Sequence, residues 1–115
     1  MRFKILFLVI LLNNVIYSQE KEYLLSTVAF YNVENLFDTI DDPNNSWDEA
    51  RTPNGEDKWT DKKYNIKLNN LSELIPKIGF DVTNSHPTII GLCEVENKQV
   101  LIDLISTGKM KDLNY

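Results

Sequence analysis

Two oxygen-bearing side chains stand at the polar ends of two apolar segments, Asn32 after residues 27–31 and Glu94 after residues 88–93. An amide oxygen and a carboxylate are ligands that Mg²⁺ and Mn²⁺ select while keeping several waters. Open α/β sheets bind their ligands outside the carboxyl ends of their strands. Asn32 and Glu94 are therefore candidate ligands of a divalent cation. The alternatives are that Glu94 only marks the exit of a strand into solvent and that Asn32 only forms a turn.

The elements that must position this pair can be read from apolar spacing. Residues 27–31 open with β-branched and aromatic types, and residues 88–93 form an apolar run without alternation. The second pattern is typical of a strand covered on both faces. Two adjacent parallel strands, with a helix between them in the chain, would bring Asn32 and Glu94 side by side.

Two helices are expected, each with a polar cap. Thr60 caps the first, with Asp61 in its first turn, and Pro76 should end or kink it near Ile75. Its apolar stripe, which indicates core packing, consists of Tyr64, Leu68, Leu71, Ile75 and Ile78. Asn97 caps the second helix, expected to continue to about Thr107 and to stop at Gly108. Its inward residues are predicted to be Val100, Leu101, Leu104 and Ile105.

The amino-acid sequences of two segments resemble those of a known family. Residues 30–38, FYNVENLFD, and residues 89–97, IIGLCEVEN, resemble the opening of the endonuclease/exonuclease/phosphatase superfamily. The closest likeness is to its exported bacterial branch, in which an acidic loop and a Lys-Trp-Thr segment, here residues 58–60, precede the first long helix. The resemblance implies that Asn32 and Glu94 help to hold the catalytic divalent ion. The family's later Asp-Asn and Asp-His pairs have no counterpart in these 115 residues.

The fold and domain organisation follow from the resemblance and the N-terminus. The resemblance implies an α/β fold, the N-terminal part of a mixed-sheet, DNase I-like sandwich, incomplete in this chain. Arg2 and Lys4 precede the apolar run 5–12, and Ser18 suits the position before a cleavage site, so residues 1–18 are expected to be a secretory signal peptide. Residues 19–26 would be a linker and 27–115 the truncated domain. We therefore expect a secreted or periplasmic protein with no transmembrane span after cleavage.

Composition narrows the class of substrate only weakly. The net charge is −5, and removing Arg2 and Lys4 makes the remaining chain more acidic. A long nucleic-acid footprint would call for a basic patch. The only concentration of basic residues comprises Lys58, Lys62, Lys63 and Lys67, which read equally well as a solvated helix face or a phosphate-facing one. Smaller phosphoesters are favoured over nucleic acid, although nucleic acid, sugar phosphate and lipid phosphate all stay open.

Other residues that invite a chemical role receive simpler interpretations. The acidic segment 38–57 lacks calcium-loop spacing, because Trp47 and Pro53 stand where a glycine and a closing glutamate belong. We interpret this segment as a solvated surface loop or as a border of the pocket that Asn32 faces. His86, the only histidine, reads as a loop residue. Cys93, the only cysteine, reads as a buried small hydrophobe. Glu96 is a candidate for positioning Glu94 without binding the cation itself.

The predicted function is a divalent-metal-dependent phosphoesterase of the exported type, using Mg²⁺ or Mn²⁺ at Asn32 and Glu94 on a phosphoester substrate. The chain is expected to be an N-terminal fragment without activity of its own, because hydrolysis also needs groups that orient water and stabilise the leaving oxygen. The alternative is a catalytically dead secreted binding or remnant module.

Overall fold

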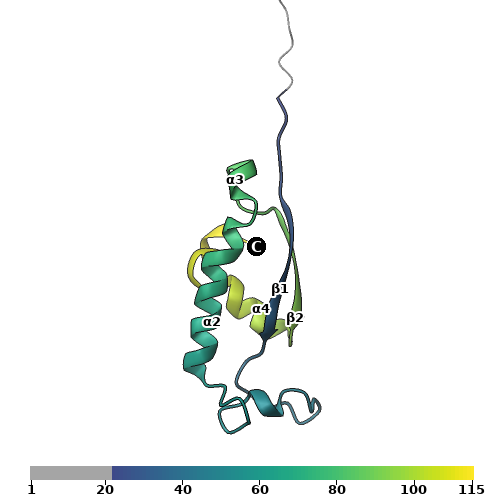
Figure 1. Cartoon of the computed structure of the whole chain (residues 1–115), viewed down its shortest axis with the longest axis vertical. Coiled ribbons are helices and arrows are strands. Elements are labelled where there is room, and N and C mark those ends of the chain that lie inside the picture. The colour runs from purple at the N-terminus through teal and green to yellow at the C-terminus, as the bar shows by residue number, and fades with distance from the viewer. Residues whose placement is uncertain (1–21) are drawn as a thin grey trace, which may run out of the picture.

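The computed structural model describes residues 22–115, so the expected signal peptide, residues 1–18, and the first part of the expected linker lie outside it. Strands β1 (Val28–Leu36) and β2 (Ile89–Val95) form a two-stranded parallel sheet. Helix α2 (Asp61–Leu74) lies between them in the chain, and the helices gather on one side of the strands (Figure 1). This α/β arrangement confirms the predicted class. Across residues 22–115, the helices are too short or too polar to cross a membrane.

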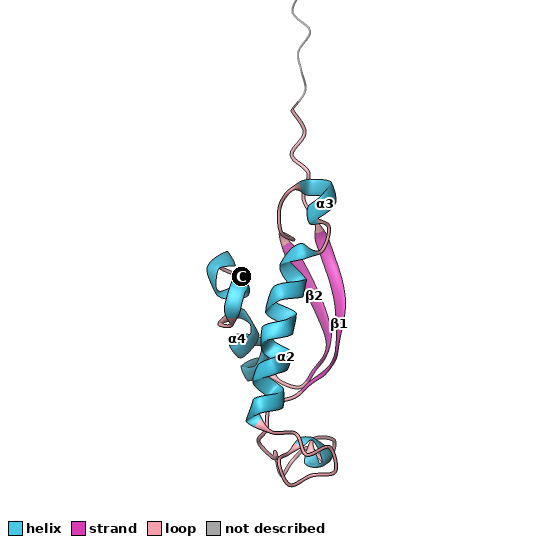
Figure 2. Ribbon diagram, turned by 60° about the vertical axis from the view of Figure 1, so that its left-hand side comes forward, coloured by secondary structure: helices cyan, strands magenta, loops and turns pink. Residues whose placement is uncertain are grey.

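The predicted start and end of α2 are confirmed. The Thr60 side chain accepts a hydrogen bond from the backbone N–H of Lys63, as an N-cap should. Pro76 stops the α-helix at Leu74 and leaves one 3-10 turn, η2 (Ile75–Lys77). Gly79 then turns the chain with a φ of 72° into the short helix α3 (Phe80–Thr83), which the sequence did not predict. Figure 2 shows α3 at the opposite end of the molecule from the acidic loop.

Helix α4 (Lys98–Ile105) begins as predicted, because the Asn97 side chain accepts from Val100 N at 3.0 Å. It ends before Thr107, and Gly108 opens a 3-10 helix, η3 (Gly108–Leu113). Val100 and Leu104 are fully buried, and Leu101 faces the space between α4 and β2 as predicted but stays 37% exposed, because that space is only partly filled. Val100 and Leu104 are one turn apart and form the buried stripe, whereas Leu101 occupies the neighbouring row.

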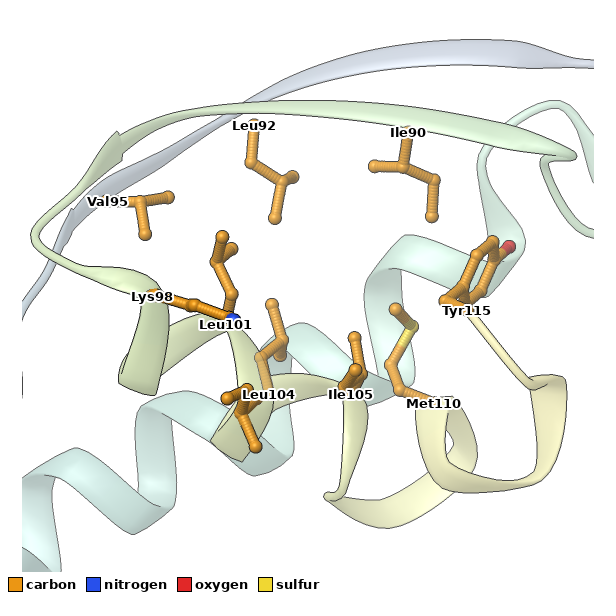
Figure 3. Close-up of a pocket in the computed structure, with 10 residues that line it drawn as sticks. Ile90, Leu92, Val95, Lys98, Leu101, Leu104, Ile105, Met110 and Tyr115 are labelled. Carbon is orange, nitrogen blue, oxygen red and sulfur yellow. The ribbon is translucent and has the colours of Figure 1, made fainter.

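The core lies between the inner face of the sheet and helices α2 and α4. Its buried members include Val33, Leu36, Leu68, Ile75, Val100 and Leu104. Beside it an apolar groove of about 420 Å³ opens between β2 and α4. Figure 3 shows Ile90, Leu92 and Val95 pointing from β2 into this groove, above Leu104 and Ile105. The inner face is thus only partly filled.

The outer face of the sheet is bare over the described residues. Val28, Phe30 and Ile89 are 71%, 77% and 60% exposed. A side chain at Gly91 would stand 2.7 Å from the Phe30 ring, so that ring lies directly over the glycine across the strand pair. Among residues 22–115 the helices pack on the inner face alone, so coverage of β2 on its other face stays a prediction.

Candidate functional site

Strand pairing brings Asn32 and Glu94 together at the carboxyl end of the sheet, as expected. Asn32 is opposite Cys93 in the parallel register, one residue before Glu94. The Asn32 Nδ2 atom donates to Glu94 Oε1 at 2.7 Å, and both side chains are exposed. The contact joins residues 62 positions apart in the chain. Their proximity is therefore a property of the fold, while their role as metal ligands stays a prediction.

The end of β1 departs from regular strand geometry just after Asn32. The register runs from Asn32 opposite Cys93 to Leu36 opposite Val95, so β1 carries two more residues than β2 over this stretch. Glu34 and Asn35 absorb the excess with φ values of 55° and 61°, and Glu94 has a φ of 60°. Left-handed backbone costs a residue other than glycine roughly 1–2 kcal/mol. Strain of this kind collects at functional sites.

The left-handed residues direct backbone N–H groups at the two site side chains. Glu34 N donates to Asn32 Oδ1 at 2.7 Å, and Asn35 N donates to Glu94 Oε2 at 3.1 Å. The first bond fixes which end of the Asn32 amide is oxygen, because the amide nitrogen could not accept there. The bulge therefore orients the candidate ligands.

Lys67, on helix α2, forms hydrogen bonds with the backbone of this bulge. Its ammonium group donates to the carbonyl oxygen of Glu34 and to that of Asn35, the latter at 3.2 Å. Burial lowers the pKa of Lys67, and the Arg51 cation lowers it further, whereas the carboxylates of Glu34 and Glu94 raise it. Lys67 thus places a positive charge close to the candidate ligands.

Glu96 holds the start of the acidic loop against the end of β2. Asp38 N donates to Glu96 Oε2 at 2.9 Å. Burial raises the pKa of Glu96, the Asp38 N–H opposes that rise, and the nearby carboxyl groups of Asp38 and Asp48 add to it. Glu96 therefore anchors the acidic loop, while its support of Glu94 stays a prediction.

Asp48 departs from the picture of a solvated loop. It is 2% exposed, and its Oδ2 atom accepts from Asp42 N at 2.9 Å. Its Oδ1 atom has no hydrogen-bond partner among residues 22–115. The surface-loop interpretation is therefore wrong at this residue, which folds inward beside Glu96.

The remaining sequence candidates lie where they take no part in the site. His86 is exposed in a loop before the amino end of β2. Glu94 is near the other end of that seven-residue strand, roughly 20 Å away by the rise of a strand. Cys93 is a free, half-buried thiol whose sulfur lies 3.9 Å from the Tyr31 carbonyl oxygen, so it is less buried than expected.

The donor set at Asn32 and Glu94 is compatible with a hard divalent cation. Asn32 Oδ1 and both Glu94 oxygens each accept one hydrogen bond, and each has a second lone pair. The exposure of both residues leaves access for the waters that Mg²⁺ retains. Within residues 22–115, no three His, Cys, Asp or Glu side chains converge as a metal cluster. A cation here would thus be held by few protein oxygens.

Sequence reasoning missed the left-handed bulge and the anchoring role of Lys67. The bulge carries Glu34 and Asn35 in place of glycine, so the tolerance of Asn for left-handed backbone was the only local signal for it. Lys67 is one helical turn after Lys63 on α2, and this spacing was the available sign that the two lysines share a face.

Comparison with known families identifies the wider group. A family model described as the endonuclease/exonuclease/phosphatase family matches residues 27–115, well over half of the chain. Comparisons with curated proteins and with solved structures gave no match. The matched range contains both strands, α2, α4 and the whole candidate site. The chain therefore belongs to the endonuclease/exonuclease/phosphatase family.

Proposed function

We propose that this chain contributes the first metal-holding residues of a divalent-metal-dependent phosphoesterase. Membership of the family supports a metal-dependent phosphoesterase in general terms. The observation that carries the proposal is the 2.7 Å contact between Asn32 and Glu94 at the carboxyl end of the sheet. Mg²⁺ or Mn²⁺ is the proposed cation, because the donors are a carboxylate and an amide oxygen.

A divalent cation at this place would withdraw charge from a bound phosphate group. Glu94 supplies the negative charge that holds the cation, and Asn32 orients the Glu94 carboxylate through its amide N–H while offering Oδ1. The backbone N–H groups of Glu34 and Asn35 keep both side chains in place. Water access is open on the exposed side of the pair.

The proposed complete fold is a two-sheet sandwich of which these strands are one part. The support is the bare outer face, where the apolar side chains of Val28, Phe30 and Ile89 are mostly exposed. Monomeric proteins rarely leave a contiguous apolar surface of this kind uncovered. The proposed location is outside the cytoplasm, supported by the charged and apolar pattern of residues 1–18. N-terminal sequencing of exported protein checks cleavage near Ser18, and an intact Met1 on that protein would contradict it.

Metal binding by the full chain tests the proposed site directly. Mn²⁺ should broaden the NMR signals of residues around Glu94, and Glu94→Gln should weaken Mn²⁺ binding about tenfold or more, because a ligand charge is lost. Glu96→Gln is the matched control, since glutamine can still accept from Asp38 N. Binding that survives Glu94→Gln and disappears with Glu96→Gln would overturn the assignment.

The second candidate is a binding or remnant module without catalysis. It is favoured by the position of His86, which lies at the opposite end of β2 from Glu94 and so supplies no general acid or base there. The full chain is expected to hydrolyse no bis-p-nitrophenyl phosphate with Mg²⁺ present. Hydrolysis that depends on both Mg²⁺ and Glu94 would exclude this candidate and show a more compact catalytic set.

A further inference from the structure

A hollow of about 390 Å³ lies next to the Asn32–Glu94 pair. Its lining comprises Glu34, Asn35, Arg51, Asp57, Trp59, Lys63 and Lys67, and we call it the basic hollow. It adjoins the site through Asn35, whose N–H donates to Glu94. Lys67 also lines a smaller hollow of about 190 Å³ together with Asn32. A substrate at Glu94 would thus extend naturally into the basic hollow.

The three cations of the basic hollow are held by backbone carbonyl groups. Arg51 Nη1 donates to Trp47 O at 2.9 Å, and Lys63 Nζ donates to Asp57 O at 2.9 Å. Lys67 donates to the carbonyls at the end of β1. The ion pairs found over residues 22–115 both involve Glu73, on another part of α2. The charges of the three cations are therefore positioned without being neutralised in direct ion pairs.

The charge balance of the basic hollow differs in sign from that of the chain. Three cationic side chains face two carboxylates, those of Glu34 and Asp57, in a protein whose net charge is −5. Lys63 and Lys67 are one helical turn apart, and the 3-10 turn η1 (Glu49–Arg51) brings Arg51 to them from the acidic loop. The guanidinium carbon of Arg51 lies over the Phe37 ring, 4.3 Å from the ring centroid. Two separate elements thus bring positive charge to one concave surface.

We propose that the basic hollow binds a second phosphate group of the substrate, beside the phosphate held at Glu94. This inference rests on the proposed phosphoesterase function. Guanidinium and ammonium groups donate several hydrogen bonds to phosphate oxygens, and the N–H groups of Arg51 not used on Trp47 remain for that purpose. The preferred substrates then carry at least two phosphate groups, either on a small molecule or as successive links of a nucleic-acid chain.

The test measures binding of inorganic pyrophosphate to the full chain in EDTA, by calorimetry and by amide NMR shifts. We expect signals of Asn35, Asp57 and Trp59 to move. Lys63→Gln should weaken binding about fivefold, and Arg51→Gln by at least as much, as expected for loss of a charge-assisted hydrogen bond. Lys62→Gln, one position earlier on the exposed start of α2, should leave binding unchanged. Asp57→Asn should tighten pyrophosphate binding, because it removes a negative charge from the lining of the basic hollow. The contact of Lys63 with the Asp57 backbone is kept in this variant.

Equal weakening by Lys62→Gln and Lys63→Gln, or no pyrophosphate binding, would overturn the proposal. Arg51→Lys provides a second variant that keeps the charge and should recover part of the affinity. A sugar bisphosphate and a phosphorylated dinucleotide distinguish a small molecule from a nucleic-acid chain as the source of the phosphates. If either compound binds more tightly than the other and in a Lys63-dependent way, the proposal is supported and that compound names the source. Failure of both compounds to bind contradicts the proposal. Because EDTA removes the cation, Glu94→Gln should not weaken pyrophosphate binding and should tighten it slightly, since it removes a negative charge near Lys67. Failure of the metal site and failure of the basic hollow are therefore distinguishable.

Discussion

At the carboxyl end of the sheet, Glu34, Asn35 and Glu94 are exposed and have left-handed backbone. Under the inner face of the same sheet, Val100 and Leu104 are fully buried in a regular helix. At the site, Glu34 and Glu94 hold a backbone conformation that glutamate disfavours, whereas the buried core residues lie in a regular helix without such strain. The difference teaches that the packed core offsets the strain of the site. Substitutions in the two regions should then change stability in opposite directions.

The largest effect is expected in the core. Leu104→Ala should lower the free energy of unfolding by about 2–5 kcal/mol, because it leaves a cavity where Leu104 is fully buried. Phe30→Ala, at a large apolar residue that is 77% exposed on the outer face, serves as the control and should cost about 0.5 kcal/mol or less. Urea unfolding measures both. Equal losses would mean that the outer face is packed in solution, as in an association of chains.

A smaller effect of opposite sign is expected at the site. Glu34→Gly should raise the free energy of unfolding by about 0.5–1 kcal/mol, because glycine removes the left-handed penalty but loses more chain entropy on folding. Lys62→Gly, in the regular first turn of α2, should instead lower it by about 0.5–1 kcal/mol. Denaturant titrations of the two variants check the contrast. Destabilisation by Glu34→Gly would show that its side chain, not its backbone, sets the local balance.

The smallest effect concerns how stability depends on pH through Tyr64, a residue at the edge of the core. Burial, and next the hydrogen bond that Tyr64 donates to Asp103 Oδ2 at 2.8 Å, raise the pKa of Tyr64 above its usual value of 10.0. A raised pKa contributes stability that is present below pH 10 and is lost as pH rises further, because the unfolded chain releases the proton first. Tyr64→Phe should therefore reduce the fall in stability between pH 9 and pH 11.

Chemical unfolding at the two pH values measures this change. Tyr23→Phe, at a phenol that is 79% exposed, is the control and should leave the fall as it is in the unaltered chain. An unchanged fall in Tyr64→Phe would show that other groups set the alkaline limit.

Local signals predicted those parts of the fold that local chemistry determines. Thr60 and Asn97 cap helices as expected, and Pro76 ends α2, because capping and the missing N–H of proline act within one turn. The contact of Asn32 with Glu94 followed from two strand ends meeting at one edge. Leu101 faces inward as predicted but is 37% exposed, because spacing along a helix does not say how completely the facing surface is covered.

The details of the site depended on contacts between distant residues. The two extra residues of β1 appear only when β1 is aligned with β2, and Lys67 finds the Glu34 carbonyl across 33 positions of the chain. The burial of Asp48 likewise depends on where the loop folds. Neither hydrophobic period nor capping chemistry contains this information, which comes from tertiary packing.

The setting of Trp59 gives the protein an optical reporter. Its indole N–H donates to Phe37 O at 3.0 Å, and the ammonium of Lys67 lies 5.8 Å from the ring centroid. The other tryptophan, Trp47, is 79% exposed and should emit as an indole in water does. Trp47→Phe would leave one fluorophore, on the wall of the basic hollow and beside a cation that an arriving anion must approach. The emission of that single ring should then register occupancy without any attached dye.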